Sequence, residues 1–184
     1  PNINLELYFC HWSGNQAMLV DLARDDSPAG RARLHYFLIN KGPWSRLDHN
    51  QPFIPGVPPK PAGASYYPDG ATKAELERWM QSLSEPERAR ATGFFTTIRR
   101  GGTGFTIVPY SAEYQPELAR MASLLREAAQ GTTDATLKNF LTRRADALLS
   151  NDYYDSDVAW MELNGVVQPT IGPYEVYEDE LFNY

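Results

Sequence analysis

The chain has 184 residues, of which 42% are hydrophobic and 22% charged, a composition that supports one good-sized core or two small ones. Its formal net charge of -6 argues against a nucleic-acid-binding protein, and no apolar run approaches the roughly 20 residues of a membrane span. A single cysteine, Cys10, excludes an internal disulfide framework. We therefore expect no nucleic-acid and no membrane partner. A cytoplasmic location is expected because no signal peptide is recognisable, with the reservation that the true N-terminus can be missing.

Residues 14–40 predict helix, because apolar residues recur there at helical spacing and Ser27-Pro28 is a typical helix start. His35, within this stretch, is expected to pack inward. Residues 41–70 carry a high density of proline, which excludes a long helix or a central strand. We expect an ordered but irregular loop there. Its aromatic side chains should hold it to the body: Trp44, Phe53, Tyr66 and Tyr67.

Two Ser/Thr-x-x-Glu patterns, at Thr72 and Ser84, predict helix starts within residues 72–92. Two β-prone runs then flank a glycine-rich stretch at 101–104, which predicts a β-hairpin over 94–110. A phosphate-binding loop is the alternative for this turn. It is disfavoured because the Gly-Lys-Ser/Thr ending is absent and no helix follows directly.

Residues 111–150 predict two long helices that pack as an antiparallel pair. The first helix places one apolar stripe at Leu118, Met121, Leu125 and Ala128. The second is expected to bury Leu137, Phe140, Leu141, Ala145, Leu148 and Leu149. With a further strand expected near 167–177, the fold class is α+β, helix-rich with a small mixed or antiparallel sheet. We treat residues 1–184 as a single portion of a larger protein.

Most signatures of catalysis are missing. His11, His35 and His49 lack the spacing of a His-x-x-x-His metal pair, and one cysteine cannot form a zinc knuckle. A Nudix pyrophosphohydrolase is an alternative, because Glu117 and Glu127 lie on a predicted helix. The spacing is off by one residue and the acidic end of the Nudix box is replaced, so this interpretation is rejected. We expect no metal to be bound by this chain.

The segment 167–184 carries a chemical pattern. If it is extended, Glu175 and Tyr177 project from the same face, because side chains alternate along a strand. A carboxylate can hold a cationic amine by charge-assisted hydrogen bonds, and a protonated phenol can donate to a developing oxyanion. The alternative is a half-buried strand with one salt-bridged glutamate, and spacing alone favours that alternative.

Four stretches add to this pattern: INKGPWSRLD at 39–48, GASYYP at 63–68, LLSNDYYDSDVAWM at 148–161 and IGPYEVYED at 171–179. In order and spacing they resemble the N-terminal portion of the dipeptidyl peptidase III family (peptidase family M49, its bacterial branch). The resemblance extends over nearly the whole chain from about residue 30.

The resemblance implies a two-lobed zinc exopeptidase that releases dipeptides from peptide N-termini. Glu175 matches the family's substrate-binding glutamate, which holds the free amine, and Tyr177 matches the catalytic tyrosine, which stabilises the tetrahedral intermediate. The family's zinc is held by two histidines of a His-Glu helix motif and a distant glutamate, all downstream of this sequence. We therefore expect an N-terminal fragment, inactive alone, whose partners are the peptide substrate and the downstream zinc-bearing lobe.

A non-catalytic peptide- or protein-binding module on the same fold is the alternative. Its binding surface would be the aromatic loop from Trp44 to Tyr67. A third possibility is a related parent that acts on another amide or on an isomerisation substrate. The chain begins at Pro1 and ends at Tyr184 directly after an aromatic run, so both ends look cut. A His-Glu motif encoded after Tyr184 would favour the peptidase, and a stop codon would favour the binding module.

Overall fold

The computed structural model describes residues 13–60, 62–63, 66–68, 70–102, 104–173 and 181–182. The chain divides into two compact units. The first contains Pro1–Ser65 with Asp179–Leu181, and the second contains Tyr66–Glu178 with Phe182–Tyr184. The described residues form helices together with two small antiparallel sheets, so the predicted helix-rich α+β class is confirmed.

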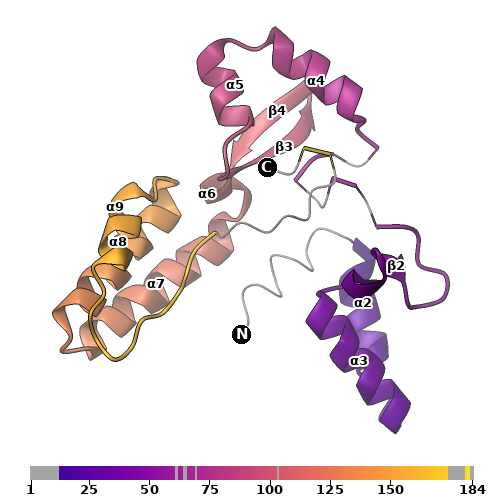
Figure 1. Cartoon of the computed structure of the whole chain (residues 1–184), viewed down its shortest axis with the longest axis horizontal. Helices are drawn as coiled ribbons and strands as arrows, with labels where there is room; N and C mark the ends of the chain where they lie inside the picture. Colours follow the sequence, from indigo (N-terminus) through magenta and orange to yellow (C-terminus); the bar gives the residue numbers. More distant parts are fainter. Residues whose placement is uncertain are drawn as a thin grey trace. The chain divides into compact units, whose positions relative to one another are not determined.

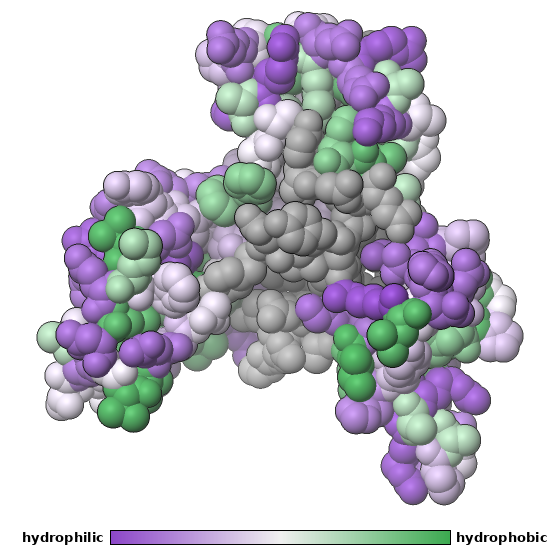
Figure 2. Space-filling model, viewed as in Figure 1, coloured by the Kyte–Doolittle hydropathy of each residue, from purple (hydrophilic) through white to green (hydrophobic). Residues whose placement is uncertain are grey.

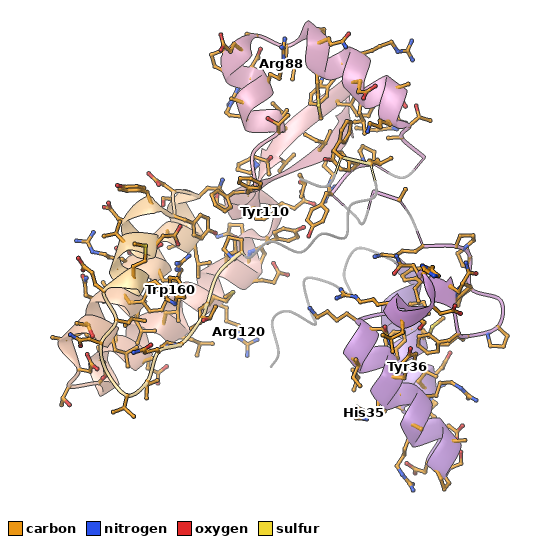
Figure 3. The ribbon with its side chains drawn as sticks, in the orientation of Figure 1. His35, Tyr36, Arg88, Tyr110, Arg120 and Trp160 are labelled. Carbon is orange, nitrogen blue, oxygen red and sulfur yellow. The ribbon has the colours of Figure 1, made fainter. Side chains whose placement is uncertain are left out.

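The first unit is built on two helices, α2 (Ser13–Leu22) and α3 (Pro28–Asn40). Ser27 caps α3 by accepting a hydrogen bond from the Gly30 amide at 3.0 Å, as the sequence predicts. Phe37 is fully buried on this helix, whereas His35 is exposed, so the expected inward packing of His35 is wrong. Two positions along a helix differ by about 200° in direction, which turns His35 away from the buried face. Figure 3 shows both His35 and Tyr36 on α3.

The proline-rich stretch contains three short elements: β1 (Trp44–Ser45), the 3-10 turn η1 (Arg46–Asp48) and β2 (Gln51–Pro52). The two strands pair antiparallel. Trp44 is buried and donates its indole N–H to the carbonyl of Pro58 at 2.8 Å. Phe53 packs edge-on against Tyr36 of α3, with ring centroids 4.8 Å apart. The Phe53 contact ties the irregular loop to α3 of its own unit, and the Trp44 hydrogen bond connects two parts of the loop itself.

The second unit begins with two helices and a hairpin: α4 (Lys73–Ser82), α5 (Glu85–Ala91), β3 (Thr96–Gly101) and β4 (Gly104–Pro109). The Thr72 hydroxyl accepts a hydrogen bond from the Glu75 amide at 3.2 Å, and the Glu87 carboxylate accepts from the Ser84 amide at 3.1 Å. Both predicted capping patterns are therefore confirmed. The visible surface over α4 and α5 is mostly hydrophilic (Figure 2).

The hairpin β3–β4 pairs in antiparallel register from Thr96 opposite Pro109 to Gly101 opposite Gly104, which confirms the prediction for 94–110. Gly102 forms the turn at a φ of 55°, a left-handed conformation that suits glycine. The glycine-rich stretch is thus the tip of a hairpin.

Four helices follow: α6 (Tyr110–Glu113), α7 (Gln115–Gly131), α8 (Ala135–Ser150) and α9 (Tyr154–Met161). Helices α7 and α8 lie side by side (Figure 1) and are joined by the short connection 132–134, which makes them antiparallel. Together with α9 they enclose the main core, whose centre includes Leu118, Ala122, Phe140, Ala145 and Leu148.

Of the residues expected in this core, Met121 and Leu137 are only partly buried and two others are exposed. Ala128 and Leu149 are exposed, because the buried stripe of α7 runs through Ala129 instead and Leu149 lies beside the buried face of α8. Helix α9 has no counterpart among the sequence-based predictions. The strand expected near 167–177 is absent over 167–173, where Pro169 and Pro173 limit strand pairing.

Helix α8 begins at a cap whose strength depends on pH. The Asp134 carboxylate accepts hydrogen bonds from the backbone amide of Leu137 at 3.1 Å and from that of Thr136 at 2.9 Å. These bonds, with one from the Thr136 hydroxyl, hold the pKa of Asp134 below its usual range. A lowered carboxyl pKa contributes stability above the unfolded pKa, and that stability is lost as pH falls through the folded pKa.

Asparagine accepts the same hydrogen bonds without titrating. The Tm of Asp134→Asn should therefore fall less steeply than that of the wild type as the pH is lowered from about 5 to about 2. Thermal unfolding followed by circular dichroism at each pH measures the difference. Parallel Tm curves for the two proteins would show that the cap does not contribute to acid sensitivity.

Candidate functional site

The two side chains singled out by the sequence, Glu175 and Tyr177, lie outside the described residues. The structure describes the chain on either side of them, at Ile171–Pro173 and at Phe182, and both flanks belong to the second unit. The geometry of these flanks is therefore what the structure contributes to the candidate site.

The first flank lies against the helical core. Ile171 packs against the buried cluster of α7, α8 and α9. Gly172 has a φ of 145°, a conformation that side-chain-bearing residues rarely adopt. A Cβ placed there would lie only 2.6 Å from Nη1 of Arg144. The backbone at this point follows a path that requires glycine.

Arg144 is the charged group beneath this flank, and it was not predicted as a site residue. Its side chain is only 4% exposed, and its Nη2 donates to the Asp157 carboxylate of α9 at 2.6 Å. The guanidinium lies 5.3 Å from the ring centroid of Phe140 and 5.5 Å from that of Tyr153. Burial raises the pKa of the Tyr153 phenol to about 12, so this ring stays neutral beside the cation.

The second flank lies against the start of α4. The ring of Phe182 is 5.5 Å from that of Tyr67, and the ammonium group of Lys73 is 5.2 Å from the Phe182 ring centroid. Tyr67 is buried. Its neighbour Tyr66 accepts a backbone hydrogen bond from Ile98 of β3 at 2.8 Å, which ties this part of the chain to the hairpin. Both flanks are thus attached to elements of the second unit.

A cluster of protonated phenols lies where the hairpin meets the helices (Figure 3, Tyr110). The rings of Tyr110 and Tyr114 stack edge-on with centroids 5.4 Å apart. Burial is the main cause that raises the pKa of both phenols well above the usual range. Arg99 forms an ion pair with Glu113 beside them, with Nη2 and Oε1 2.5 Å apart. Neither these phenols nor this ion pair was identified from the sequence. The ion pair joins β3 to α6, and such a contact between separate elements is not visible in a sequence pattern.

A shallow pocket of about 490 Å³ lies between α4 and the tip of the hairpin. Its walls include the Glu75–Arg100 ion pair, at 3.1 Å, and the edge-on contact between Trp79 and Phe105, at 5.4 Å between centroids. These residues include no nucleophile beside a base. The pocket therefore offers no catalytic site on its own.

The described residues contain no group of three or more His, Cys, Asp or Glu side chains that could hold a metal ion. His35 and His49 are both exposed side chains of the first unit. No helix in the described part of the chain is long and apolar enough to cross a membrane.

Comparisons with known proteins give one sequence relative and two structural ones, and no family model matches the chain. The chain is 34% identical to Nudix hydrolase 3 of Arabidopsis thaliana, in an alignment that covers 94% of this chain and 29% of that protein. The structure of dipeptidyl-peptidase III from Corallococcus sp. strain EGB matches with a TM-score of 0.90 and 62% identity, over 96% of this chain and 33% of that chain. The structure of DPP III from Caldithrix abyssi matches with a TM-score of 0.89 and 44% identity, over 99% and 35%.

The chain therefore spans about a third of the length of these relatives. The plant relative is named as a Nudix hydrolase, but α7 of this chain shows no Nudix site. On this helix Arg126 is paired with Asp146 of α8 at 2.6 Å, and Glu127 is exposed. Both structural matches extend over nearly all of this chain at identities well above those at which only a fold is shared. Over nearly its whole length the chain is therefore similar to about a third of dipeptidyl peptidase III.

Proposed function

We propose that this chain is the N-terminal part of a zinc-dependent dipeptidyl peptidase that removes dipeptides from the N-termini of peptides. The observation that carries the proposal is the match to dipeptidyl-peptidase III of Corallococcus, at 62% identity over 96% of this chain. Within the whole enzyme, Glu175 binds the free amine of the substrate and Tyr177 stabilises the oxyanion. The chain alone binds substrate at most and does not cleave it.

Glu175 suits the task of recognising a peptide N-terminus. That terminus is an ammonium group, and a carboxylate holds it through short, charge-assisted hydrogen bonds. Anchoring the amine at a fixed distance from the scissile bond makes a dipeptide the product. The anchored flanks at Gly172 and Phe182 support this role, because a recognition group must be held in place by its surroundings.

Tyr177 suits the stabilisation of negative charge. A phenol with an ordinary pKa of about 10 is protonated at neutral pH and can donate a hydrogen bond. Attack on the scissile carbonyl places negative charge on its oxygen, and a donor aimed at that oxygen stabilises the transition state more than the substrate. In an extended segment this donor would lie on the same face as Glu175.

The described residues do not fit a zinc site, so in this proposal zinc is held by a His-Glu motif and a glutamate beyond Tyr184. When bound, zinc would polarise the scissile carbonyl and lower the pKa of the attacking water. One amine anchor and one phenol cannot replace that chemistry. The downstream zinc-bearing lobe and the peptide substrate are therefore the proposed partners of this chain, and its cytoplasmic location stays a prediction.

Digestion of a peptide of defined sequence by the full-length protein tests the proposed function. Mass spectrometry should show stepwise release of N-terminal dipeptides, and a chelator should abolish this release until zinc is restored. Release of single residues, or cleavage only at internal bonds, would contradict the proposal. Peptide binding without any cleavage would favour the non-catalytic module, although Trp44 of its supposed binding loop is buried.

Glu175→Ala in the full-length protein should raise KM for peptides with a free N-terminus about 10- to 100-fold, since a hydrogen bond to a charged group contributes about 1.5–3 kcal/mol. The change in kcat should be smaller, because the amine is bound in both ground and transition states. Glu127→Ala, at an exposed position of α7, is the matched control and should leave KM unchanged. An unchanged KM in Glu175→Ala would remove the amine-binding role.

A further inference from the structure

The contact between Gly172 and Arg144 shows how the chain before Glu175 is held. A Cβ at Gly172 would lie 2.6 Å from Nη1, 3.3 Å from Cζ and 3.7 Å from Cδ of Arg144. The side of the guanidinium group that carries Nη1 therefore faces the backbone of Gly172. With its φ of 145° this glycine cannot take a side chain without strain, so the close approach depends on both residues.

The neighbouring residue, Arg143, provides an internal comparison. Arg143 and Arg144 both extend from α8 to carboxylates of α9, Arg143 to Asp155 at 3.2 Å and Arg144 to Asp157 at 2.6 Å. Arg143 makes its ion pair while 47% exposed, whereas the Arg144 side chain is 4% exposed. An ion pair between these two helices therefore does not require a buried guanidinium.

The burial of Arg144 is unfavourable in free energy, and the ion pair alone does not explain why this side chain is buried. Removing a guanidinium from water is unfavourable, and its Nε has no hydrogen-bond acceptor anywhere in the described structure. What distinguishes Arg144 from Arg143 is that it lies near the rings of Phe140 and Tyr153 and against the backbone of Gly172. The buried position fits a group that holds this backbone in one place.

We propose that Arg144 is a positioning residue for substrate binding: fixed by Asp157, it sets the backbone path at Gly172 and thereby the placement of Glu175. This inference rests on the function proposed above. Glu175 follows Gly172 by three residues, so it lies within about 10 Å of it along even a fully extended chain. A misplacement of about 1 Å in an active site can cost as much as 100-fold in rate, which shows how sensitive such sites are to small shifts. For a group that binds the substrate, we expect the effect of a shift at Gly172 to appear in KM.

Arg144→Lys in the full-length protein is the informative change, because lysine keeps the charge but lacks the planar guanidinium that faces Gly172. KM for a peptide with a free N-terminus should rise about 10-fold, with a smaller change in kcat. Arg143→Lys, the matched control, should leave both constants unchanged. Thermal unfolding of the two variants separates loss of fold from loss of positioning.

A double-mutant cycle with Glu175→Ala distinguishes positioning from a merely structural role. If Arg144 acts through Glu175, Arg144→Lys combined with Glu175→Ala should have the same KM as Glu175→Ala alone, within about twofold. If the rises in KM caused by the two single changes multiply in the double variant, the inference is overturned and the proposed function stays intact. A wild-type KM for Arg144→Lys together with a raised KM for Glu175→Ala would have the same meaning. A Glu175→Ala variant with wild-type kinetics would overturn the proposed function itself.

Asp157→Asn gives a second test should Arg144→Lys fail to fold. Asp157 is 57% exposed, so its replacement leaves the core intact while it loosens the guanidinium. The same rise in KM, again absent when Glu175 is already alanine, is expected. A wild-type KM in a folded Asp157→Asn protein would contradict the assignment of Arg144.

Discussion

Tyr177→Phe in the full-length protein should lower kcat about 100- to 1000-fold while KM for the same peptide changes little, because removal of one oxyanion donor typically has that effect. The phenol differs from the phenyl ring by a single hydroxyl group. That group is proposed to act on the tetrahedral intermediate, where negative charge has developed, rather than on the bound substrate. Such an interaction contributes to kcat and not to ground-state binding.

Steady-state kinetics on one dipeptidyl substrate measures this effect. Tyr154→Phe is the matched control, since Tyr154 is 75% exposed on α9, and it should leave kcat unchanged. A kcat for Tyr177→Phe within about threefold of the wild type would show that this phenol is not the oxyanion donor.

Phe140→Ala should destabilise the protein by about 3–5 kcal/mol, the usual loss when a buried phenylalanine is truncated in a packed core. Phe140 is fully buried at the centre of the α7–α9 core. It also supplies one of the two rings beside Arg144, so its loss leaves a cavity next to a buried charge. Equilibrium unfolding in urea measures the change in the free energy of unfolding.

Leu149→Ala on the same helix is the matched control, because Leu149 is 42% exposed. Its loss should be less than about 1 kcal/mol, as for other substitutions of partly exposed apolar residues. A similar loss for the two variants would mean that the core is not centred on Phe140.

The elements that could be predicted from the sequence are those whose signals are local. Thr72 and Ser84 start helices because their own neighbours supply the capping bonds. The glycine-rich stretch forms a hairpin because its turn conformation depends on adjacent residues. These interactions lie within a few residues along the chain, so a single sequence contains most of the information.

What could not be predicted depends on contacts between distant residues. Arg144 is buried because Asp157 and Gly172 are brought to it by the fold, whereas charged residues are normally exposed. Helix α9 buries two small residues, Ser156 and Ala159, and exposes larger ones such as Met161. Its apolar periodicity is therefore weak, and a search for hydrophobic stripes passes over it.

The candidate site, unlike the helices and the hairpin, could not be predicted from local sequence signals alone. Spacing alone favours an ordinary half-buried strand for 167–177, and only the family resemblance assigns roles to Glu175 and Tyr177. The structure adds the constraints on either side of them, the glycine-specific path at Gly172 and the aromatic contact of Phe182. Their roles stay predictions, and the positioning by Arg144 emerges only from the three-dimensional contacts.

Hydrolysis of one peptide with a free N-terminus and of the same peptide with an acetylated N-terminus tests the central assignment most directly. The ratio of the two kcat/KM values should be large for the wild-type full-length protein, because acetylation removes the charge that Glu175 is proposed to bind. In Glu175→Ala most of that preference should disappear. If Glu175→Ala kept the full preference for the free amine, the N-terminus would be recognised by other residues, and the segment 167–184 would not bind it.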